Sequence, residues 1–351
     1  MPQHAYEAGA FLFNAKKKTA RITAYVLNKL FIIRLNEETF QQSPCSLKKF
    51  LRLLGRLEGT HEEASECEGD TDDPLQDLYD WVLEPFLPAF ALLRQDEPEL
   101  AQVDYHYTFA DWLFPDTRRC TVAVSEEDRL APVYLAQEQE QECTRNPDVA
   151  TNFILDQTAL DIDVSMFPIY SPQEVKIPAS TGSLPAVPRK VLVKGQPGFL
   201  KVVWAGDARA AIREVSKYAK MHAAGFDDSV YTSKLIGLVH DGNGCAVGLL
   251  LNYIDCGDGG PLDYINVVDP RYSRLKQKWY DQIEGALREL HSHGIVWGDA
   301  AATNVLIDRE TNAYLVDFGG GFTPGWVERE EANSLQEDLQ GLERIRRFLF
   351  G

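Results

Sequence analysis

The sequence has 351 residues and a formal net charge of −18, with 53 acidic and 35 basic side chains. Apolar residues make up 44% and charged residues 25%, which is typical of a globular protein with room for two domains. The acidic balance argues against nonspecific binding to nucleic acid or to anionic membrane, because both select basic surfaces.

Targeting signals and cysteine spacing restrict the compartment. No stretch reaches the roughly 20 apolar residues of a membrane span, and residues 1–10 lack the apolar core of a signal peptide. The six cysteines include no Cys-x-x-Cys pair, which is poor spacing for a metal site and for a disulfide framework. We therefore expect reduced thiols in a cytoplasmic or nuclear protein.

Residues 1–168 predict a separate N-terminal domain of mixed helix and strand content. Residues 20–35 fit either a pair of strands or a buried helix, and periodicity alone does not separate the two. Further elements are an amphipathic helix over 46–57, a proline-interrupted helix over 74–93 and short strands over 105–133. This half shows no metal or nucleophile constellation, so the sequence does not predict its role.

The pattern changes in residues 169–351, where strands come first and helices follow. The predicted elements are strands at 171–176, 189–194 and 198–204, a helix at 208–223, an apolar run at 245–254, a helix at 271–292 and a strand–turn–strand at 304–318. This order is typical of an α+β domain with two lobes.

The most specific pattern consists of two polar motifs, each beside an apolar strand. The first is Trp297–Asp299 with Asn304 five positions after Asp299, and the second is Asp317–Gly319. This spacing is that of the catalytic and metal-binding loops of kinases. Phosphoryl transfer needs a carboxylate that orients the attacking hydroxyl, a role that suits Asp299. The side-chain oxygens of Asn304 and Asp317 suit Mg²⁺, which is a hard cation.

A lysine inside an apolar strand marks a second element of the site. Lys201 lies at the centre of Phe199–Val203, and a buried ammonium without a partner is costly. Glu214 on the following predicted helix is the best candidate partner, and such a pair would orient the α- and β-phosphates. The alternative for Glu214 is a solvated helix face. Two other lysines compete for the strand position but have fewer apolar neighbours, Lys190 and Lys194.

Three further features are less specific. Residues Asn252, Tyr253 and Ile254 end an apolar run and fit a linker whose backbone could bind adenine. The turn at 180–183 contains Gly182 and is the best candidate for a loop that covers phosphates. Asp338 lies on a late predicted helix, where it could hydrogen-bond the backbone of the Asp299 loop or face water.

These motifs resemble those of the protein-kinase-like superfamily, particularly compact fungal kinase-like proteins with the pattern W-G-D-A-K-x-x-N-V-L-I-D followed by V-D-F-G-G-G. The resemblance covers roughly the second half of the chain, and residues 297–308 and 316–321 are its specific parts. It implies a two-lobed fold with a shortened C-terminal lobe, ATP and Mg²⁺ as cofactors, and a hydroxyl acceptor on a protein or a small molecule. It also implies a catalytic role for Asp299, metal binding by Asn304 and Asp317, and nucleotide binding by Lys201, Glu214, Asn252, Tyr253, Ile254 and Gly182.

The chain departs from the family pattern at several positions. Ala301 stands where the family has a lysine that touches the transferring phosphoryl group, and loss of this cation removes transition-state stabilisation. Gly298 replaces the arginine before the catalytic aspartate, as in aminoglycoside and choline kinase loops. There is no Gly-x-Gly-x-x-Gly loop, and the part after Asp317 is short and lacks an Ala-Pro-Glu motif.

The sequence therefore predicts an ATP- and Mg²⁺-dependent phosphotransferase that acts on a protein hydroxyl. Two alternatives remain open. A pseudokinase that binds nucleotide or serves as a scaffold is favoured by Ala301 and by the missing glycine loop. A small-molecule kinase of the aminoglycoside or choline type is favoured by Gly298 and by the short C-terminal part.

Overall fold

The computed structural model describes residues 5–14, 16–59, 71–100, 102, 105–125, 127–136, 145–150, 163–178, 182–257, 259–321 and 334–351. The chain forms two compact units, and each is made of two segments: Met1–Pro147 with Gln173–Pro188, and Asp148–Pro172 with Arg189–Gly351. The predicted boundary at residue 168 falls inside the first segment of the second unit. The reason is long-range strand pairing, because the chain returns to the first unit after residue 172.

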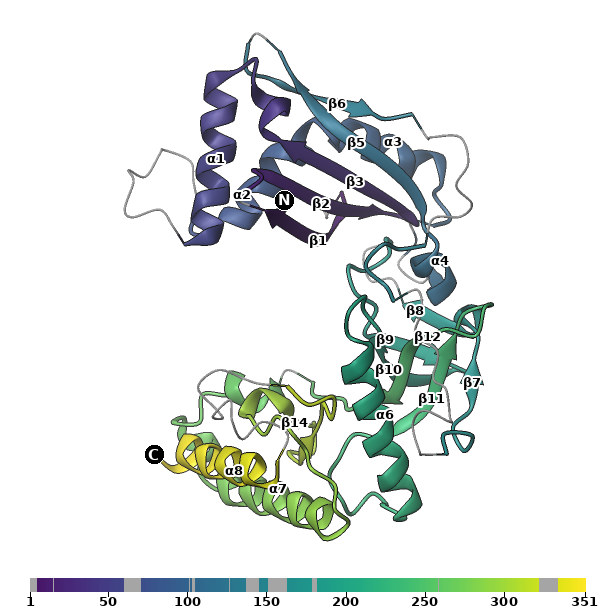
Figure 1. Ribbon diagram of the computed structural model, residues 1–351, viewed down its shortest axis with the longest axis vertical. Helices are drawn as coiled ribbons and strands as arrows, with labels where there is room; N and C mark the ends of the chain where they lie inside the picture. Colours follow the sequence, from purple (N-terminus) through teal and green to yellow (C-terminus); the bar gives the residue numbers. More distant parts are fainter. Residues whose placement is uncertain are drawn as a thin grey trace. The chain divides into compact units, whose positions relative to one another are not determined.

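The first unit contains a five-stranded sheet in the order β1-β2-β3-β5-β6 (Figure 1). The strands are β1 (Glu7–Asn14), β2 (Thr19–Val26), β3 (Lys29–Asn36), β5 (Asp116–Val124) and β6 (Leu130–Tyr134). Neighbouring strands are antiparallel except β3 and β5, which are parallel. Residues 20–35 thus form a pair of strands and not a buried helix.

Three helices cover one face of this sheet: α1 (Pro44–Glu58), α2 (Pro74–Leu83) and α3 (Leu87–Asp96). Helix α1 begins after Ser43, whose hydroxyl accepts a hydrogen bond from the Ser46 amide at 3.0 Å. The predicted interruption by prolines is a 3₁₀ turn, Glu84–Phe86, between α2 and α3. Alternate residues of β2, β3 and β5 pack with these helices in one apolar cluster.

The smaller elements of the first unit include two paired strands, β4 (His106–Thr108) and β8 (Val175–Pro178). The others are α4 (Phe109–Leu113) and two 3₁₀ turns, η1 (Glu37–Phe40) and η3 (Pro172–Glu174). The predicted strand at 171–176 is therefore wrong in its bounds, because the η3 turn occupies half of it and the strand begins at Val175.

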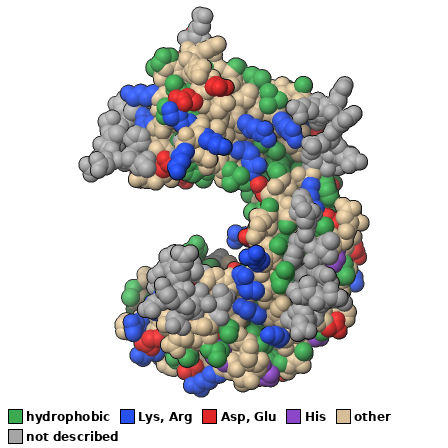
Figure 2. All heavy atoms as spheres, in the orientation of Figure 1, with side chains coloured by type: hydrophobic (Ala, Val, Ile, Leu, Met, Phe, Trp, Pro, Cys, Tyr) green, Lys and Arg blue, Asp and Glu red, His purple; other side chains and the backbone are tan. Residues whose placement is uncertain are grey.

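Lysine and arginine side chains gather over the strands on the visible face of the first unit, although the whole chain is acidic (Figure 2). Arg21 of β2 and Arg34 of β3 are direct cross-strand neighbours. Like charges in this position repel each other. The net charge of the chain thus does not describe the charge of each of its faces.

The second unit has a sheet with the strand order β9-β10-β12-β11-β7, and its strands are β7 (Ile169–Tyr170), β9 (Lys190–Val193), β10 (Gln196–Val202), β11 (Leu235–His240) and β12 (Ala246–Asn252). Only the β7–β11 pair is parallel. Helix α6 (Ala208–Ala223) has the bounds that the sequence predicts. Strand β11 was not among the predicted elements.

The remainder of the second unit is mostly helical (Figure 1). Helices α7 (Leu275–Ser292) and α8 (Leu335–Phe350) lie beside a small sheet of β13 (Gly260–Pro261), β14 (Val305–Ile307) and β15 (Ala313–Leu315). Three 3₁₀ turns connect these elements, η4 (Leu262–Tyr264), η5 (Pro270–Tyr272) and η6 (Ala302–Asn304). One continuous apolar cluster joins α6 and β12 to α7 and α8. The predicted α+β class is confirmed.

Membrane insertion by a helix finds no support in this fold. Within the described ranges, no helix combines the length and the apolar character of a bilayer span.

Helix α8 approaches the Asp299 loop closely at Gly341. A Cβ atom added at Gly341 would collide with the backbone and the Cβ of Ala300. The contact is with main-chain atoms of a buried segment, which cannot give way as the end of a flexible side chain could. Only glycine therefore allows this packing.

We expect Gly341→Ala to lower the free energy of unfolding by about 1–3 kcal/mol, because it overpacks a filled core. The matched control is Gly285→Ala on α7, where an added Cβ meets no atom within 4 Å. That change should leave stability unchanged or raise it by up to about 1 kcal/mol, since alanine is the better helix former. Urea midpoints measure both effects, and equal midpoints for the two variants would contradict the close approach.

Candidate functional site

A single ammonium group joins three elements of the second unit. Lys201 Nζ on β10 lies 2.7 Å from Glu214 Oε2 on α6 and 2.8 Å from Asp317 Oδ1. The predicted pairing of Lys201 with Glu214 is thus present. The Glu214 side chain is 1% exposed and that of Asp317 is 47% exposed, so the cluster runs from the interior to the solvent.

The competing lysines contact aromatic rings instead. Lys190 Nζ lies 4.6 Å from the centre of the Tyr253 ring, and Lys194 Nζ lies 5.3 Å from that of Tyr170. Such cation–π contacts stabilise a charge on a sheet surface. The three lysines of this sheet therefore differ in their surroundings, and only Lys201 holds a buried carboxylate.

The ionisation of this cluster follows from burial and mutual attraction. Burial alone lowers the pKa of Lys201, but the carboxylates of Glu214 and Asp317 outweigh it and raise that pKa overall. Burial raises the pKa of Glu214, Lys201 acts against this shift, and Asp317 adds to it. The charged form of Lys201 is therefore favoured, whereas the ionised form of Glu214 is disfavoured by burial and favoured by Lys201.

The backbone at Asp317 is left-handed, with φ of 59°, which is uncommon for a residue that is not glycine. The Gly319 amide donates to Asp317 Oδ1 at 3.3 Å, and Arg213 Nε on α6 donates to the Gly319 carbonyl at 2.8 Å. These contacts hold Asp317 in a backbone conformation that would otherwise be unfavourable. They fix the Asp317 carboxylate beside Lys201.

Asp338 of α8 is the main support of the segment before Asp299. Its side chain is completely buried and accepts hydrogen bonds from the backbone amides of Trp297 and Gly298, both at 2.8 Å. His291 Nε2 of α7 lies 2.8 Å from the same carboxylate. Of the two alternatives for Asp338, the structure shows the hydrogen bonds to the loop backbone, so the residue does not face water.

The segment at Trp297 and Gly298 has three further connections. Gly298 has φ of 80°, a left-handed conformation that favours glycine, and its carbonyl accepts from the Gly321 amide at 3.0 Å. Trp297 Nε1 donates to the Val316 carbonyl at 2.8 Å. Lys217 Nζ of α6 donates to the Trp297 carbonyl at 2.9 Å. Lys217 and His291 were not identified from the sequence as supports, because Lys217 contacts a main-chain group and His291 contacts a side chain that is distant in the chain.

Asn304 is tied to Asp299 through the backbone. Its Nδ2 donates to the Asp299 carbonyl at 2.9 Å, and the Val316 amide donates to the Asn304 carbonyl at 3.0 Å. The predicted strand–turn–strand is present, with Val305 of β14 opposite Leu315 of β15. The hairpin thus spaces Asn304 from Asp317.

Asp299 and Ala301 differ in their access to solvent. Asp299 is partly exposed, and its carboxylate lies beside Gly321, where an added Cβ would come within 3.3 Å of Oδ2. Ala301 is completely buried. The loop therefore exposes part of the Asp299 side chain, whereas Ala301 is enclosed by its surroundings.

The predicted adenine linker follows β12. The Asn252 amide donates to the Lys234 carbonyl at 2.9 Å, and Asn252 Oδ1 accepts from the Lys234 amide at 2.6 Å. This contact fixes the position of the backbone that leads into Tyr253 and Ile254, both of which are partly exposed.

Gly182 lies in the first unit and not among the second-unit residues around Lys201. Its carbonyl accepts from the Tyr107 hydroxyl at 3.0 Å, and the next residue, Ser183, is buried and accepts from the Leu27 amide at 2.9 Å. Residues 180 and 181 of the predicted phosphate-covering turn lie outside the described residues. The described contacts thus give Gly182 a structural role in its own unit.

The donor set fits a magnesium ion that is held partly by phosphate. In the described segments, no three side chains of His, Cys, Asp or Glu gather as a metal site. Mg²⁺ is commonly bound through one or two carboxylates together with substrate phosphates, so a complete protein cage is not required. Asp317 is half-exposed beside a cation that suits phosphate oxygens, and Asn304, the last residue of the η6 turn before β14, supplies an amide oxygen.

No protein-family model matches the chain, and no curated protein matches its sequence.

Removal of Lys201 should make stability depend on pH. In Lys201→Met the buried Glu214 keeps its position without its cation, which raises its pKa further above the unfolded value. Such a carboxyl stabilises the fold below the unfolded pKa and loses this contribution as pH rises towards the folded pKa. We expect a small cost at about pH 4 and a clearly larger one at about pH 7, by ~1.4 kcal/mol for each unit of additional shift.

The measurement is denaturant unfolding at several pH values. Lys190→Met is the matched control, because it removes a lysine from the adjacent strand without touching Glu214. The same pH dependence in both variants would show that Lys201 does not hold Glu214 in its ionised form.

Proposed function

We propose that the second unit is a compact, two-lobed protein-kinase-like domain that binds ATP with Mg²⁺ and transfers a phosphoryl group to a protein hydroxyl. The observation that carries this proposal is the position of Lys201, whose ammonium lies within 2.8 Å of both the Glu214 and the Asp317 carboxylates. A structural ion pair needs only one of them. The second, half-exposed carboxylate places an acidic metal ligand next to a phosphate-binding cation.

The cofactors would lie among residues of known position. Lys201 would contact the phosphates, Asp317 and Asn304 would hold Mg²⁺, and the backbone of residues 252–254 would contact adenine. When bound, Mg²⁺ neutralises the charge that develops on the phosphate oxygens. Asp317 makes its hydrogen bonds and its ion pair through Oδ1, and Oδ2 has no hydrogen bond within the described chain. That leaves one carboxylate oxygen for a cation.

Asp299 would orient the acceptor hydroxyl and accept its proton at the carboxylate. This role demands a fixed loop, because a misplaced general base loses much of its effect. The loop is fixed on both sides of Asp299, by Asp338 at Trp297 and Gly298 and by Asn304 at the Asp299 carbonyl. These supports come from the chain itself and do not require a ligand.

A second candidate function is nucleotide binding without transfer, as in a pseudokinase. The buried Ala301 favours it, since this position supplies no cation to the transferring phosphoryl group. Two cations of α6 are engaged with backbone carbonyls, Arg213 with Gly319 and Lys217 with Trp297. Without a replacement, transition-state stabilisation is weaker by a term that typically costs about 10²–10³ in rate.

We expect ATP to raise the melting temperature of the second unit only when Mg²⁺ is present. At ten times the dissociation constant, mass action stabilises the folded state by about 1.4 kcal/mol, which corresponds to a few degrees. The variants Lys201→Met and Asp317→Asn should lose most of this shift. The matched control Asp228→Asn changes an exposed aspartate on the same unit and should keep it. Absence of any shift at millimolar ATP would contradict both candidate functions.

Transfer is tested separately, with radiolabelled ATP and a degenerate peptide library that contains Ser, Thr and Tyr acceptors. We expect wild type and Asp228→Asn to label peptides, and Asp299→Asn to retain the thermal shift but lose labelling by at least about 10²-fold. Equal labelling by wild type and Asp299→Asn, together with a retained thermal shift, would leave the pseudokinase as the function.

A further inference from the structure

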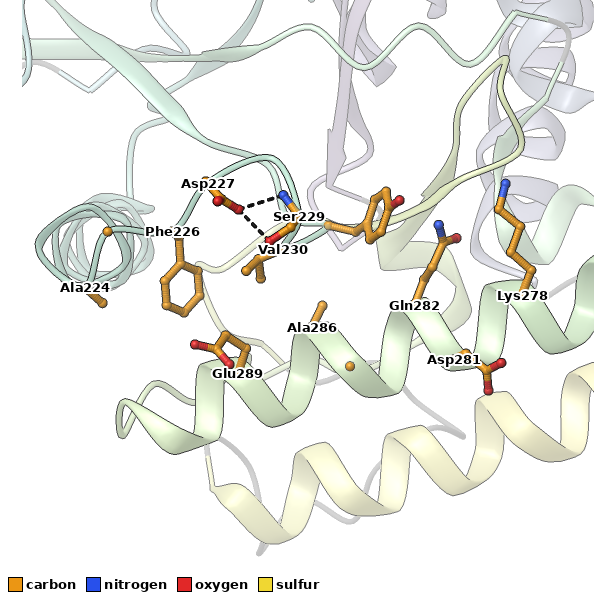
Figure 3. A pocket seen from close by; sticks show the side chains of 13 residues that line it. Ala224, Phe226, Asp227, Ser229, Val230, Lys278, Asp281, Gln282, Ala286 and Glu289 are labelled. Carbon is orange, nitrogen blue, oxygen red and sulfur yellow. Dashed lines mark hydrogen bonds between the residues drawn. The ribbon is translucent and has the colours of Figure 1, made fainter.

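A groove of about 880 Å³ lies between the loop that follows α6 and the exposed side of α7 (Figure 3). It is lined by residues 224–231, apart from Asp228, and by α7 residues between Lys278 and Glu289. Neither Lys201 nor Asp317 lines it, so it is distinct from the proposed nucleotide site. Its volume lies within the usual range of ligand-binding pockets, roughly 300–1,000 Å³.

The loop wall of the groove is shaped by the end of α6. Gly225 has φ of 75°, and its amide donates to the His222 carbonyl, while the Phe226 amide donates to the Met221 carbonyl at 3.1 Å. This is a glycine-terminated helix end, which turns the chain sharply out of the helix. The chain therefore leaves α6 and runs alongside α7.

The groove has an apolar floor. Phe226 projects from the loop towards α7, and Ala286 points from α7 into the groove (Figure 3). Val230 lies on the loop between them, and Phe226 contacts the His293 ring edge-on at 5.3 Å. These side chains form an apolar surface that one large apolar side chain of a ligand can contact.

Gly285 lies in the interior of α7, on the floor of the groove. It is exposed, and a Cβ added there would meet no atom within 4 Å. Glycine in a helix interior costs about 1 kcal/mol relative to alanine, and here no packing contact accounts for it. What the missing side chain provides is open space against the helix backbone inside the groove.

The rim of the groove is acidic. Asp227 on the loop and Glu289 on α7 line it with two carboxylates against one ammonium, that of Lys278. Asp281 of α7 points away from the loop (Figure 3) and accepts a hydrogen bond from Gln277 Nε2 at 2.8 Å. Lys278 Nζ donates to the Glu310 carbonyl and to Thr311 Oγ1, both at 3.1 Å, so it is turned towards the β14–β15 turn. The rim therefore attracts cations.

We propose that this groove binds a segment of a partner protein in which Lys or Arg side chains flank a large apolar side chain. The apolar side chain fills the space above Gly285, between Phe226 and Ala286, and the basic side chains pair with Asp227 and Glu289. Binding of a second copy of this chain is a separate outcome that the test below distinguishes. The inference does not rest on the proposed function.

The test is a selection of random short peptides, displayed on phage, against the full chain. We expect enrichment of peptides with Lys or Arg next to Leu, Ile or Phe, and loss of their affinity by at least about tenfold in Gly285→Phe, whose side chain enters the groove. Arg288→Phe adds the same side chain to α7 outside the groove lining and should keep the affinity. Melting temperatures establish that both variants are folded.

A second, independent test reverses one charge of the rim and leaves the apolar floor of the groove unchanged. Glu289→Lys should weaken the selected peptides by a similar factor, and added salt should weaken their binding to wild type. Four outcomes would overturn the proposal: no enriched peptide, enriched peptides that are acidic or uncharged, equal binding to wild type and Gly285→Phe, or a wild-type dimer that Gly285→Phe abolishes, which would assign the groove to a second copy.

Discussion

The arrangement of the helical part of the second unit depends on the hydrogen bonds that the buried carboxylate of Asp338 accepts. A buried carboxylate is costly unless its oxygens accept hydrogen bonds, and here the donors come from two other segments, the Trp297–Gly298 backbone and His291. Helix α8, helix α7 and the loop before Asp299 therefore have to meet at one point. Gly341, three residues along α8, lets the same helix lie directly against Ala300. The hydrogen bonds of Asp338 and the close packing at Gly341 thus both hold the Asp299 loop against α8.

Sequence reasoning worked where the determinants are local. The bounds of α6 follow from its apolar periodicity, and the pairing of Lys201 with Glu214 follows from a lysine with apolar neighbours on both sides. It did not work where the determinants are distant in the chain. Strand β11 is identified by its pairing with β12 and β7, and its own six residues contain a glycine that weakens the strand pattern. The role of Asp338 depends on amides some forty positions away, so its two alternatives could not be separated from the sequence.

The boundary between the two units also depends on contacts between residues that are distant in the chain. Composition changes near residue 168, which predicts one boundary, but residues 173–188 return to the first unit because β8 pairs with β4. A local pattern cannot show that a short strand belongs with a partner about seventy residues earlier. Net charge is equally limited, since the acidic chain carries both the adjacent Arg21 and Arg34 of the first unit and the acidic rim on α7. Averages over the chain do not describe single faces.

Helix α6 is bound to three separate segments by consecutive turns of one face. Arg213 contacts the Gly319 carbonyl, Glu214 holds Lys201 of β10, and Lys217 contacts the Trp297 carbonyl. A tilt of this helix would disturb all three contacts together, because the three segments are joined through α6. The same helix ends at Ala223, and the chain after it, from Ala224 and Gly225 onward, forms the wall of the groove on α7. One helix therefore carries both the buried partner of Lys201 and the start of the groove wall.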